Sequence, residues 1–527
     1  MPAKSIAGGK ALSTKTAAKP TRKAPTKRSA ASSSATASTP ATPASRKRKA
    51  QDDEAPDEAR RSKTARTAAG VQYGHQPKPK RGRRPRIAAS AAPRVLNKAP
   101  TQVLAAYAFG TGDCGELGLG PKQKSAPRPR LNKFLDPTSP DGMRIVQLAC
   151  GGMHVVALTE DSKIITWGVN DKGALGRDTN WEGKLRDMDA EESEEEDDDE
   201  LNPLESTPTA LPDDAFPEGT VLVQVAAGDS CSLALTDTGS VYGWGTFLNS
   251  EGRPGFCYDS TGKFIEEQRR PLLLPGLKDI TQITCGSNHA LALDVHGNVW
   301  AWGAGEQRQL GRQLLPGRER TGFVPKHVEI ARNNTKYIAS GPYHSFAVDG
   351  RDRVWGWGLN SFGEAGNYSP FSDTLPYPMR VSQVGGEGVV LLDGGAHHSV
   401  AVTGDGECYV WGRIDGGQLG IEFNADQLAD ETLVVRDERD KPRVCTRPVP
   451  VSHIGRVAYA VCASGHTIFI NEEGRAYSAG FGFMGQLGHG DEEDVETAKK
   501  IEGKAVREQI LTWAGAGGQF SLVAGPR

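Results

Sequence analysis

The sequence predicts an all-β fold, a seven-bladed β-propeller. Three observations predict it: a recurring phrase, a regular spacing of glycines, and the division of one repeat between the two ends of the chain. The clearest copy of the phrase, residues 282–311, reads as two apolar strands joined by a Gly turn and followed by Trp-Gly and Leu-Gly. Alternating apolar residues mark half-buried strands, and self-similarity at a fixed period marks a repeat architecture.

Glycines keep the register of the repeats. In seven copies a Gly ends the aromatic strand, and in six of them a second Gly stands eight positions later. The exception follows Gly245, where that position holds Arg253. One slot at the start of the second strand is mostly histidine: His154, Cys231, His289, His344, His398, His466 and Phe520. Because the slot recurs, we expect His289, His344 and His466 to cap or brace the backbone of the neighbouring blade.

The ends of the repeat region decide the topology. Residues 107–120 carry only the aromatic-Gly half of the phrase, and residues 511–525 carry only the other half. Six complete copies and two complementary halves make seven repeats. A closed ring explains the split, because the terminal strands then share one blade and no sheet edge is left open.

Residues 1–98 are predicted to be a disordered basic tail in front of the propeller, which we place at residues 99–527. The tail holds 24 Lys and Arg against 5 Asp and Glu, a balance of +19 that leaves −21 for the remainder, because the net charge is −2. It has few large apolar residues, so burial cannot offset its ordering entropy. Its basic clusters are Arg46, Lys47, Arg48 and Lys49, and Lys80, Arg81, Arg83, Arg84 and Arg86.

Both clusters suit nuclear import, and both suit DNA binding through phosphate neutralisation. The second cluster resembles an AT-hook, but an extra Arg interrupts the Gly-Arg-Pro core at residues 82–85. The alternative is a basic tail that binds without regard to sequence. DNA is the expected partner in both cases.

Three insertions interrupt the repeats. Residues 187–200 are almost wholly acidic and are expected to form a disordered surface loop, since like charges at this density repel. A histone-tail mimic or a partner for the basic tail is the functional alternative for this loop. Residues 246–256 replace the closing Leu-Gly of one repeat. Residues 421–450 are charged, and the sequence assigns them no purpose.

No catalytic set emerges from the sequence. It holds no His/Cys/Asp cluster at metal-ligand spacing, no Gly-x-x-x-x-Gly-Lys phosphate loop and no nucleophile elbow, so we expect no cofactor, no metal and no covalent chemistry. The eight cysteines lack paired spacing, as is typical of a reducing compartment. There is no apolar run at the N-terminus, and no window approaches the roughly 20 apolar residues of a membrane span. We expect a soluble intracellular protein without membrane contacts.

Positions that vary between copies are the better candidates for function, because the blade does not dictate them. The two residues between the Gly and the His slot lie on loops at one face of the ring, and Asp229 is the only carboxylate among them. Asp113, in the loop after Gly110, is a second acidic candidate.

The segments AGDS, LALTDTGSVYGWG, GALGRDT and GEQRQLGR resemble the regulator-of-chromosome-condensation family over roughly residues 103–525. GGMH followed by GALGRDT, with the insertion after Trp244-Gly245, is more specific than the repeat itself. The resemblance, to fungal members in particular, implies a chromatin-bound exchange factor for the GTPase Ran that promotes GDP release and GTP loading. It also implies a nuclear location and a part in nucleocytoplasmic transport, spindle assembly and nuclear envelope organisation.

The same resemblance assigns roles to residues. Residues 246–256 would be a β-wedge that contacts the GTPase through Phe247, Leu248, Asn249, Ser250, Glu251, Gly252, Arg253, Pro254 and Gly255. Asp229, Asn288, His397 and His398 would carry the exchange reaction, with Asn288 standing where animal members have Asp. Asp113, His154 and Arg312 would add GTPase contacts, and Arg318 and Arg320 would reach the acidic patch of the nucleosome. An import receptor would bind the basic tail.

Another class of protein competes with this interpretation. A chromatin-bound interaction propeller without exchange activity would need the tail but neither the wedge nor Asp229. A propeller that regulates a fused enzyme would need a catalytic domain, for which the chain has no residues left. A repeat enzyme with its site in the central channel is disfavoured by the missing acid and base.

Overall fold

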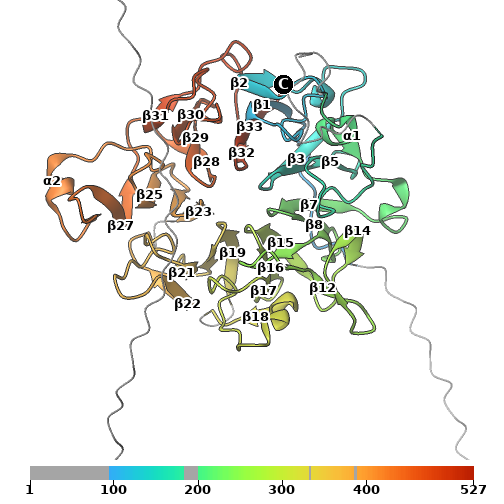
Figure 1. The fold of residues 1–527 in the computed structure, drawn as a ribbon, viewed down its shortest axis with the longest axis horizontal. Helices are drawn as coiled ribbons and strands as arrows, with labels where there is room; N and C mark the ends of the chain where they lie inside the picture. Colours follow the sequence, from blue (N-terminus) through green and yellow to red (C-terminus); the bar gives the residue numbers. More distant parts are fainter. Residues whose placement is uncertain (1–93, 183–199, 331–333, 385–387) are drawn as a thin grey trace, which may run out of the picture. The chain divides into compact units, whose positions relative to one another are not determined.

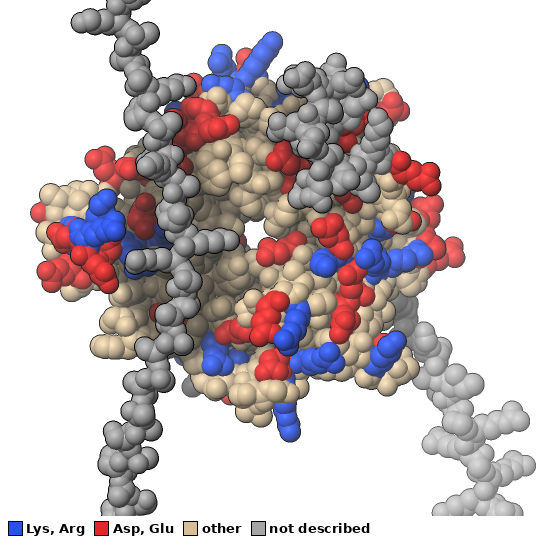
Figure 2. Space-filling view, in the orientation of Figure 1, with Lys and Arg blue, Asp and Glu red and all other residues tan. Residues whose placement is uncertain are grey.

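Seven antiparallel sheets stand like blades around a central opening in the computed structural model, which describes residues 94–182, 200–330, 334–384 and 388–527 (Figure 1). Six of these sheets have four strands and one has five. The innermost strand of each blade contacts that of the next, and the last contacts the first. The predicted seven-bladed propeller is confirmed. Its opening, visible in Figure 2, holds a cavity of about 350 Å³.

Each blade runs from an innermost strand at the opening to an outer strand at the rim, and we name each blade by its second strand. The innermost strands are β3 (Ile145–Cys150), β7 (Leu222–Ala227), β15 (Ile280–Cys285), β19 (Thr335–Ser340), β23 (Val389–Gly394), β28 (Val457–Cys462) and β32 (Trp513–Ala516). The second strands are β4 (His154–Thr159), β8 (Cys231–Thr236), β16 (His289–Asp294), β20 (His344–Asp349), β24 (His398–Thr403), β29 (His466–Asn471) and β33 (Phe520–Gly525). The third strands are β5 (Ile164–Gly168), β9 (Val241–Gly245), β17 (Val299–Gly303), β21 (Val354–Leu359), β25 (Cys408–Arg413), β30 (Ala476–Gly480) and β1 (Ala105–Thr111). The outer strands are β6 (Thr209–Ala210), β14 (Gln268–Leu273), β18 (Lys326–Val328), β22 (Thr374–Val381), β27 (Pro442–Pro450), β31 (Val495–Lys500) and β2 (Ser125–Leu131).

Short elements occupy the loops. The insertion after β9 forms a hairpin of β10 (Phe247–Leu248) and β11 (Pro254–Gly255), and a second hairpin of β12 (Cys257–Tyr258) and β13 (Phe264–Ile265) follows it. β26 (Val434–Arg436) pairs with β27, so the insertion at residues 421–450 supplies the fifth strand of the β24 blade. The helical segments are α1 (Pro203–Ser206), α2 (Ala425–Ala429), η1 (Lys133–Leu135), η2 (Asp213–Ala215) and η3 (Glu319–Phe323).

Both ends of the chain build the β33 blade. β1 pairs with β33 in antiparallel register from Ala105 opposite Gly525 to Gly110 opposite Phe520. The strand order β2-β1-β33-β32 places the N-terminal strands on the outer side of the blade and the C-terminal strands on the inner side. The division of one repeat between the two termini, predicted from the sequence, is confirmed.

The ring extends N-terminal of the boundary predicted at residue 99. The backbone N–H groups of Leu96 and Asn97 donate to the carbonyl of Asp237, and the Asn97 side chain donates to the carbonyls of Thr236 (3.0 Å) and Ile280 (2.8 Å). These contacts tie the segment to two neighbouring blades. The predicted basic clusters between residues 46 and 86, and residues 187–199 of the acidic insertion, lie outside the described residues.

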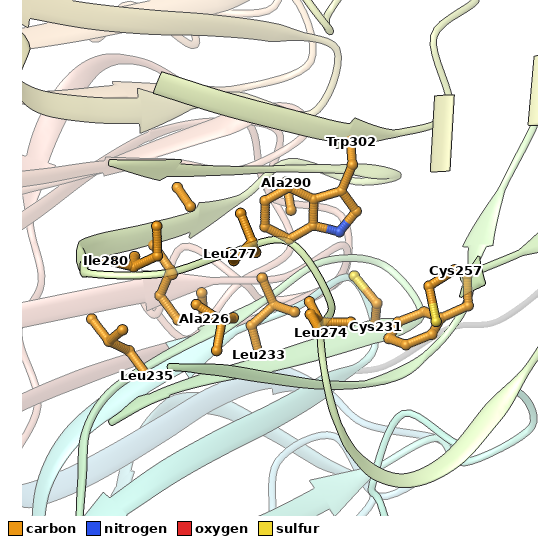
Figure 3. Close-up of a cluster of buried hydrophobic side chains, with 14 of the residues drawn as sticks. Ala226, Cys231, Leu233, Leu235, Cys257, Leu274, Leu277, Ile280, Ala290 and Trp302 are labelled. Atoms are coloured by element: carbon orange, nitrogen blue, oxygen red, sulfur yellow. The ribbon is translucent and has the colours of Figure 1, made fainter. Parts of the chain in front are cut away.

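Apolar side chains fill the space between neighbouring blades, as the β8–β16 joint illustrates (Figure 3). There Leu233 and Leu235 pack with Ala290 and Trp302 of the next blade. Five tryptophans occupy equivalent positions and are exposed by 1% at most: Trp167, Trp244, Trp302, Trp357 and Trp411. Burying a large apolar side chain stabilises a fold by about 1.5–3 kcal/mol, so these joints hold the ring together.

A repeated chain of hydrogen bonds also joins the blades. In five joints the imidazole in the His slot donates through Nε2 to the hydroxyl that follows the slot in the next blade. All five distances are 2.8 Å: His154–Ser232, His289–Ser345, His344–Ser399, His398–Thr467 and His466–Ser521. Each hydroxyl donates in turn to a loop carbonyl of the preceding blade. The recurring histidines brace the neighbouring blade as predicted, but their ring nitrogen contacts a side-chain hydroxyl there and not the expected backbone.

Two joints lack this chain of hydrogen bonds. In both, the slot residue is not His and the facing residue of the next blade has no hydroxyl. Cys231 faces a blade whose matching residue is Ala290, and Phe520 faces one whose matching residue is Val155. In the β8–β16 joint the indole Nε1 of Trp302 also has no hydrogen-bond partner among the described residues, whereas other buried tryptophans of this set donate to a loop carbonyl. The insertion after β9 explains this difference, since it replaces the loop that would supply the carbonyl.

Candidate functional site

One face of the ring collects two sets of loops. The loops after the innermost strands and the loops after the third strands leave each blade at the same end, because alternate turns of an antiparallel sheet do so. The pairing of His289 with Gly303 at that end of the β16 blade shows the arrangement. We call it the hairpin face, after the insertion at residues 246–256.

The hairpin of β10 and β11 has a buried base and an exposed tip. Phe247 is fully buried and stacks on Phe256 and Phe323, with ring centroids 5.9 and 6.4 Å apart. A Cβ on Gly255 would lie 2.6 Å from the Phe323 ring, so only glycine fits there. At the tip, Gly252 has a φ of 74°. The base therefore fixes the hairpin on the ring and leaves residues 250–253 in solvent.

Asn288 connects the hairpin to Asp229. Its side-chain oxygen accepts from the backbone N–H of Leu248 at 2.7 Å, and its side-chain N–H group donates to Asp229 Oδ2 at 3.5 Å. The backbone N–H of Asp229 donates to the Ser287 carbonyl at 2.8 Å. The amide of Asn288 serves both neighbours at once, which an ionised Asp could not do, because a carboxylate cannot donate.

Asp229 lies in a half-buried position near the opening. Burial raises its pKa, and a hydrogen bond from the Ser287 side chain opposes that rise. Burial, together with the nearby charge of Asp229, raises the pKa of Tyr343 on the next blade but one. The three predicted residues Asp229, Asn288 and Leu248 thus form one connected group, and Tyr343 lies within its electrostatic reach.

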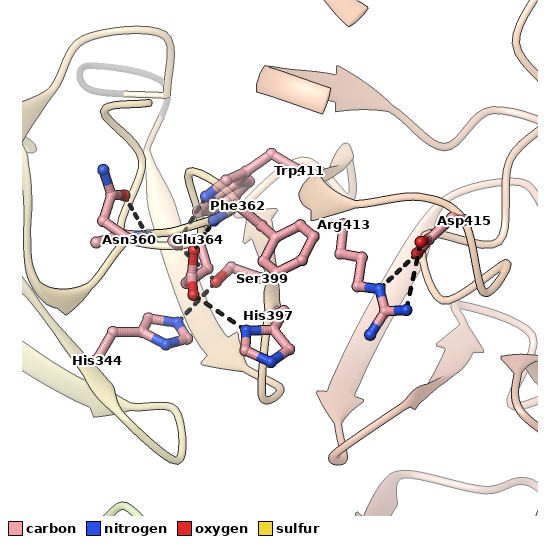
Figure 4. A network of polar contacts seen from close by, with 10 residues as sticks. His344, Asn360, Phe362, Glu364, His397, Ser399, Trp411, Arg413 and Asp415 are labelled. Atoms are coloured by element: carbon pink, nitrogen blue, oxygen red, sulfur yellow. Dashed lines mark hydrogen bonds and ion pairs between the residues drawn. The ribbon is translucent and has the colours of Figure 1, made fainter. Parts of the chain in front are cut away.

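A second polar group lies on the β20 and β24 blades (Figure 4). Nδ1 of His397 lies 3.4 Å from Oε1 of Glu364, whose side chain is fully buried, and its ring centroid lies 4.8 Å from that of Phe362. The other oxygen of Glu364 accepts from the backbone N–H of Phe362 at 2.7 Å. The guanidinium of Arg413 lies 5.4 Å from the Phe362 ring centre and pairs with Asp415. His397 is therefore held by a buried carboxylate and an aromatic ring.

His154 and His398 do not present their rings on the hairpin face. They are exposed by 1% and 0%, and each imidazole lies inside a blade joint. The expected contacts of these two residues with a partner are therefore corrected, because the first residue of a second strand points sideways into the next blade. His397, one position earlier, has a side chain that is 31% exposed.

Arg312 also faces inward. Its guanidinium donates to the carbonyls of Ala301 at 2.9 Å and of Gly322 and Val324 at 3.4 Å. Arg177 holds the matching position of the β4 blade and likewise donates to backbone carbonyls. The guanidinium thus ties η3 and its loop to the blade, and the predicted GTPase contact of the half-exposed Arg312 stays a prediction.

The remaining predicted residues are exposed. Asp113 lies in solvent on the hairpin face. Arg318 caps the start of η3 in an exposed loop. Arg320 lies 4.5 Å from the ring centre of Phe264 and 3.4 Å from Glu266 Oε1, so its guanidinium already has partners within the chain. The η3 loop and the hairpin border a groove of about 710 Å³.

Sequence reasoning missed Tyr343, Phe362 and Arg413. Tyr343 stands at one of the variable positions before the His slot, so position alone could have selected it. Phe362 follows the third strand of the β20 blade and Arg413 ends the third strand of the β24 blade, and no local pattern connects them. Only the fold brings them together.

The described part of the chain contains no group of three or more His, Cys, Asp or Glu residues able to hold a metal ion. None of its helices has the length and apolar composition needed to cross a membrane. What the site offers is a surface with one raised hairpin, a half-buried carboxylate and a stacked histidine. These features define a β-propeller that binds a partner on one face.

Comparison with known proteins agrees with this class. The family model of the RCC1-like domain matches residues 105–523. The guanine nucleotide exchange factor SRM1 of Saccharomyces cerevisiae is 38% identical over 435 residues, covering 80% of this chain and 88% of the relative. The human regulator of chromosome condensation is 28% identical over 428 residues, covering 79% and 89%. The solved structure of Prp20p from Saccharomyces cerevisiae superposes with a TM-score of 0.72 at 35% identity, covering 81% of this chain and 93% of that one. The chain belongs to the RCC1-like domain family.

Proposed function

We propose that this protein is a guanine-nucleotide exchange factor for the small GTPase Ran, which it binds through the hairpin face. The observation that supports this most directly is the connected group Asp229–Asn288–Leu248, which couples an exposed hairpin to a half-buried carboxylate. Among the relatives, SRM1 is named a guanine nucleotide exchange factor, and the Prp20p structure is described with its binding to Gsp1p and histones.

The proposed mechanism is competition between two ligands of the GTPase, without a covalent step. If the propeller binds the nucleotide-free GTPase more tightly than the loaded one, it must lower nucleotide affinity by the same factor. The tip at residues 250–253 would occupy the space that the nucleotide-binding loops of the GTPase need when nucleotide is bound. Its buried base resists displacement, because Phe247 is stacked in the core.

Asp229 would act on the charged groups that hold the phosphates. A carboxylate near the bound nucleotide repels phosphate and attracts the basic residues that bind it. Asn288 would position both the carboxylate and the hairpin, since it contacts each of them. Asp113 lies on the same face and would add negative charge at its edge.

The test is the release of a fluorescent GDP analogue from purified Ran with catalytic amounts of the full chain. The variants are Asp229→Ala and replacement of residues 249–253 by a Gly-Ser linker of equal length. The matched control replaces residues 260–262, the tip of the neighbouring β12–β13 hairpin, in the same way. We expect fast release with the wild type and the control, and losses of at least about tenfold with the two variants, about 1.4 kcal/mol in transition-state free energy. A folded wild type that does not accelerate release would refute exchange activity and favour a chromatin-bound interaction propeller.

We further propose that the chain acts in the nucleus on chromatin, with the basic residues of 1–98 on DNA and Arg318 on the acidic patch of the nucleosome. The balance of +19 in that segment supports DNA binding. The relatives include Prp20p, described with histones, and yeast RCC1 (Prp20) in a structure bound to Kap60, in line with an import receptor as partner of the basic clusters. Arg318→Glu should weaken nucleosome binding but not naked-DNA binding. Deleting residues 1–93 should weaken both, more strongly at low salt, and leave exchange on free Ran intact.

A further inference from the structure

The charged insertion at residues 421–450 places an arginine on the hairpin face. Residues 421–450 form α2, β26 and β27, and β27 pairs with β25 so that Val444 stands opposite Arg413. The backbone N–H of Ile414 donates to the Arg443 carbonyl at 3.0 Å. Arg443 therefore lies beside Arg413, at the end of the blade that faces the same side as the hairpin.

Both guanidinium groups lie near one aromatic ring. Arg413 is 5.4 Å and Arg443 is 5.0 Å from the ring centre of Phe362, and the ring of His397 lies 4.8 Å from the same ring. Figure 4 shows Arg413 and His397 beside Phe362. Arginines next to aromatic faces lose less side-chain freedom on binding, because the ring already restrains the guanidinium plane. We call Arg413, Arg443 and His397 the arginine site.

Within the arginine site, Arg443 is the cation that no carboxylate of the described residues neutralises. Arg413 pairs with Asp415, and the carboxylate near His397 is the buried Glu364. Arg443 is exposed and has no acidic partner among the described residues. The chain outside residues 1–98 carries a formal −21, so a cationic patch on this ring stands out against its surroundings.

We propose that the arginine site is a second docking point for the GTPase, a subsite for carboxylate side chains on its surface. The inference rests on the exchange activity proposed above. The β24 blade lies across the central opening from the β8 blade, so the site and the hairpin would hold one partner from two sides (Figure 1). Guanidinium groups bind carboxylates in two-pronged geometry, and Arg443 has its hydrogen-bond donors available. The hairpin would displace the nucleotide-binding loops of the GTPase, and the arginine site would set the orientation of the GTPase on the ring.

The test compares Arg443→Glu, Arg443→Lys and a matched control in steady-state exchange on Ran with the full chain. The control is Arg351→Glu, which changes the charge equally but lies in the exposed β20–β21 turn at the opposite end of the blades. We expect Arg443→Glu to raise KM by about 3- to 10-fold at low salt with little change in kcat, and the difference to shrink as salt screens the charges. Arg443→Lys should keep most of the affinity.

A charge-reversal scan identifies the partner side. Each exposed Asp and Glu on the surface of Ran is changed to Arg in turn. One such change should restore the KM measured with Arg443→Glu and should raise the KM measured with the wild-type propeller. Equal KM values for Arg443→Glu and Arg351→Glu, or no rescuing reversal, would overturn the proposed subsite. A wild type that fails to accelerate GDP release would instead refute the exchange activity itself, so the two failures are distinguishable.

Discussion

Lowering the pH from 7.5 to 5.0 should weaken the propeller at its blade joints. The five joint imidazoles are neutral in the folded chain, because burial lowers their pKa values: His154 and His466 to about 4, and His289, His344 and His398 to about 3. In the unfolded chain each titrates near its ordinary 6.5. Above pH 6.5 both states are neutral, and below it only the unfolded chain takes up protons, so stability falls with pH.

The expected loss is large. Each pH unit between the two pKa values is worth about 1.4 kcal/mol, so at pH 5.0 each imidazole costs about 2 kcal/mol and the five together about 10 kcal/mol. Buried carboxyl groups oppose them: burial raises the pKa values of Asp229, Glu116 and Glu205, and that of Asp393, at the central opening, to about 7. The proton uptake of Asp393 in the folded state stabilises the ring by about 3 kcal/mol at pH 5.0, so the five imidazoles and Asp393 together leave a loss of about 7 kcal/mol.

Urea unfolding of the full chain, followed by tryptophan fluorescence between pH 7.5 and 5.0, measures this loss. His344→Gln removes one titrating joint group and should reduce the loss between pH 7.5 and 5.0 by about 2 kcal/mol, roughly 30% of the loss of about 7 kcal/mol. His453→Gln, at an exposed imidazole, is the control and should leave the slope unchanged. An unfolding free energy that stays constant or rises below pH 6.5 would refute the reasoning, as would equal slopes for the two variants.

Three further changes test the joints and the site. Ser399→Ala should cost about 1–3 kcal/mol in urea unfolding, because the Nε2–H of His344 loses its acceptor; adding His344→Cys, which copies the β8–β16 joint, should recover part of it. Asn288→Asp should shift the pH profile of nucleotide release upward, since a second carboxylate disfavours ionisation of Asp229; an unchanged profile would show that the two groups are not coupled. Arg312→Lys should speed amide hydrogen exchange in residues 322–324, because a lysine cannot reach all the carbonyls that the guanidinium holds; unchanged rates would deny Arg312 its tethering part.

The fold could be predicted because its signal is local and repeated. Each strand pair lies within one stretch of the sequence, and each Gly that ends a third strand, such as Gly245 and Gly303, adopts a positive φ that favours glycine. The split repeat then left only one way to close the ring. The hairpin was predictable from the same regularity, since an insertion shows clearly against a constant background.

The site was harder to predict because side-chain direction depends on the next blade. His398 was assigned to the face from its neighbour's role, yet the joint turns its ring inward. A signal for this was present in the sequence. Wherever the slot residue of one blade is His, the residue after the slot in the next blade carries a hydroxyl. Where the slot residue is Cys231, the matching residue of the next blade is Ala290. Arg443 lies inside the insertion at residues 421–450, and Phe362 lies in the preceding blade, so no spacing rule could bring them together.

Because the β33 blade combines strands from distant parts of the sequence, it can be completed only late in the synthesis of the ring. β1 emerges from the ribosome long before its partner strand β33, which begins at Phe520. At roughly 5–20 residues per second, the more than 400 intervening residues keep β1 without its inner neighbour for tens of seconds. Until then six blades can form in order while the seventh stands open with an unpaired strand edge. Chains that stall before β33 should therefore be recognised by chaperones through that edge, and the emergence of β33 is the step that closes the ring.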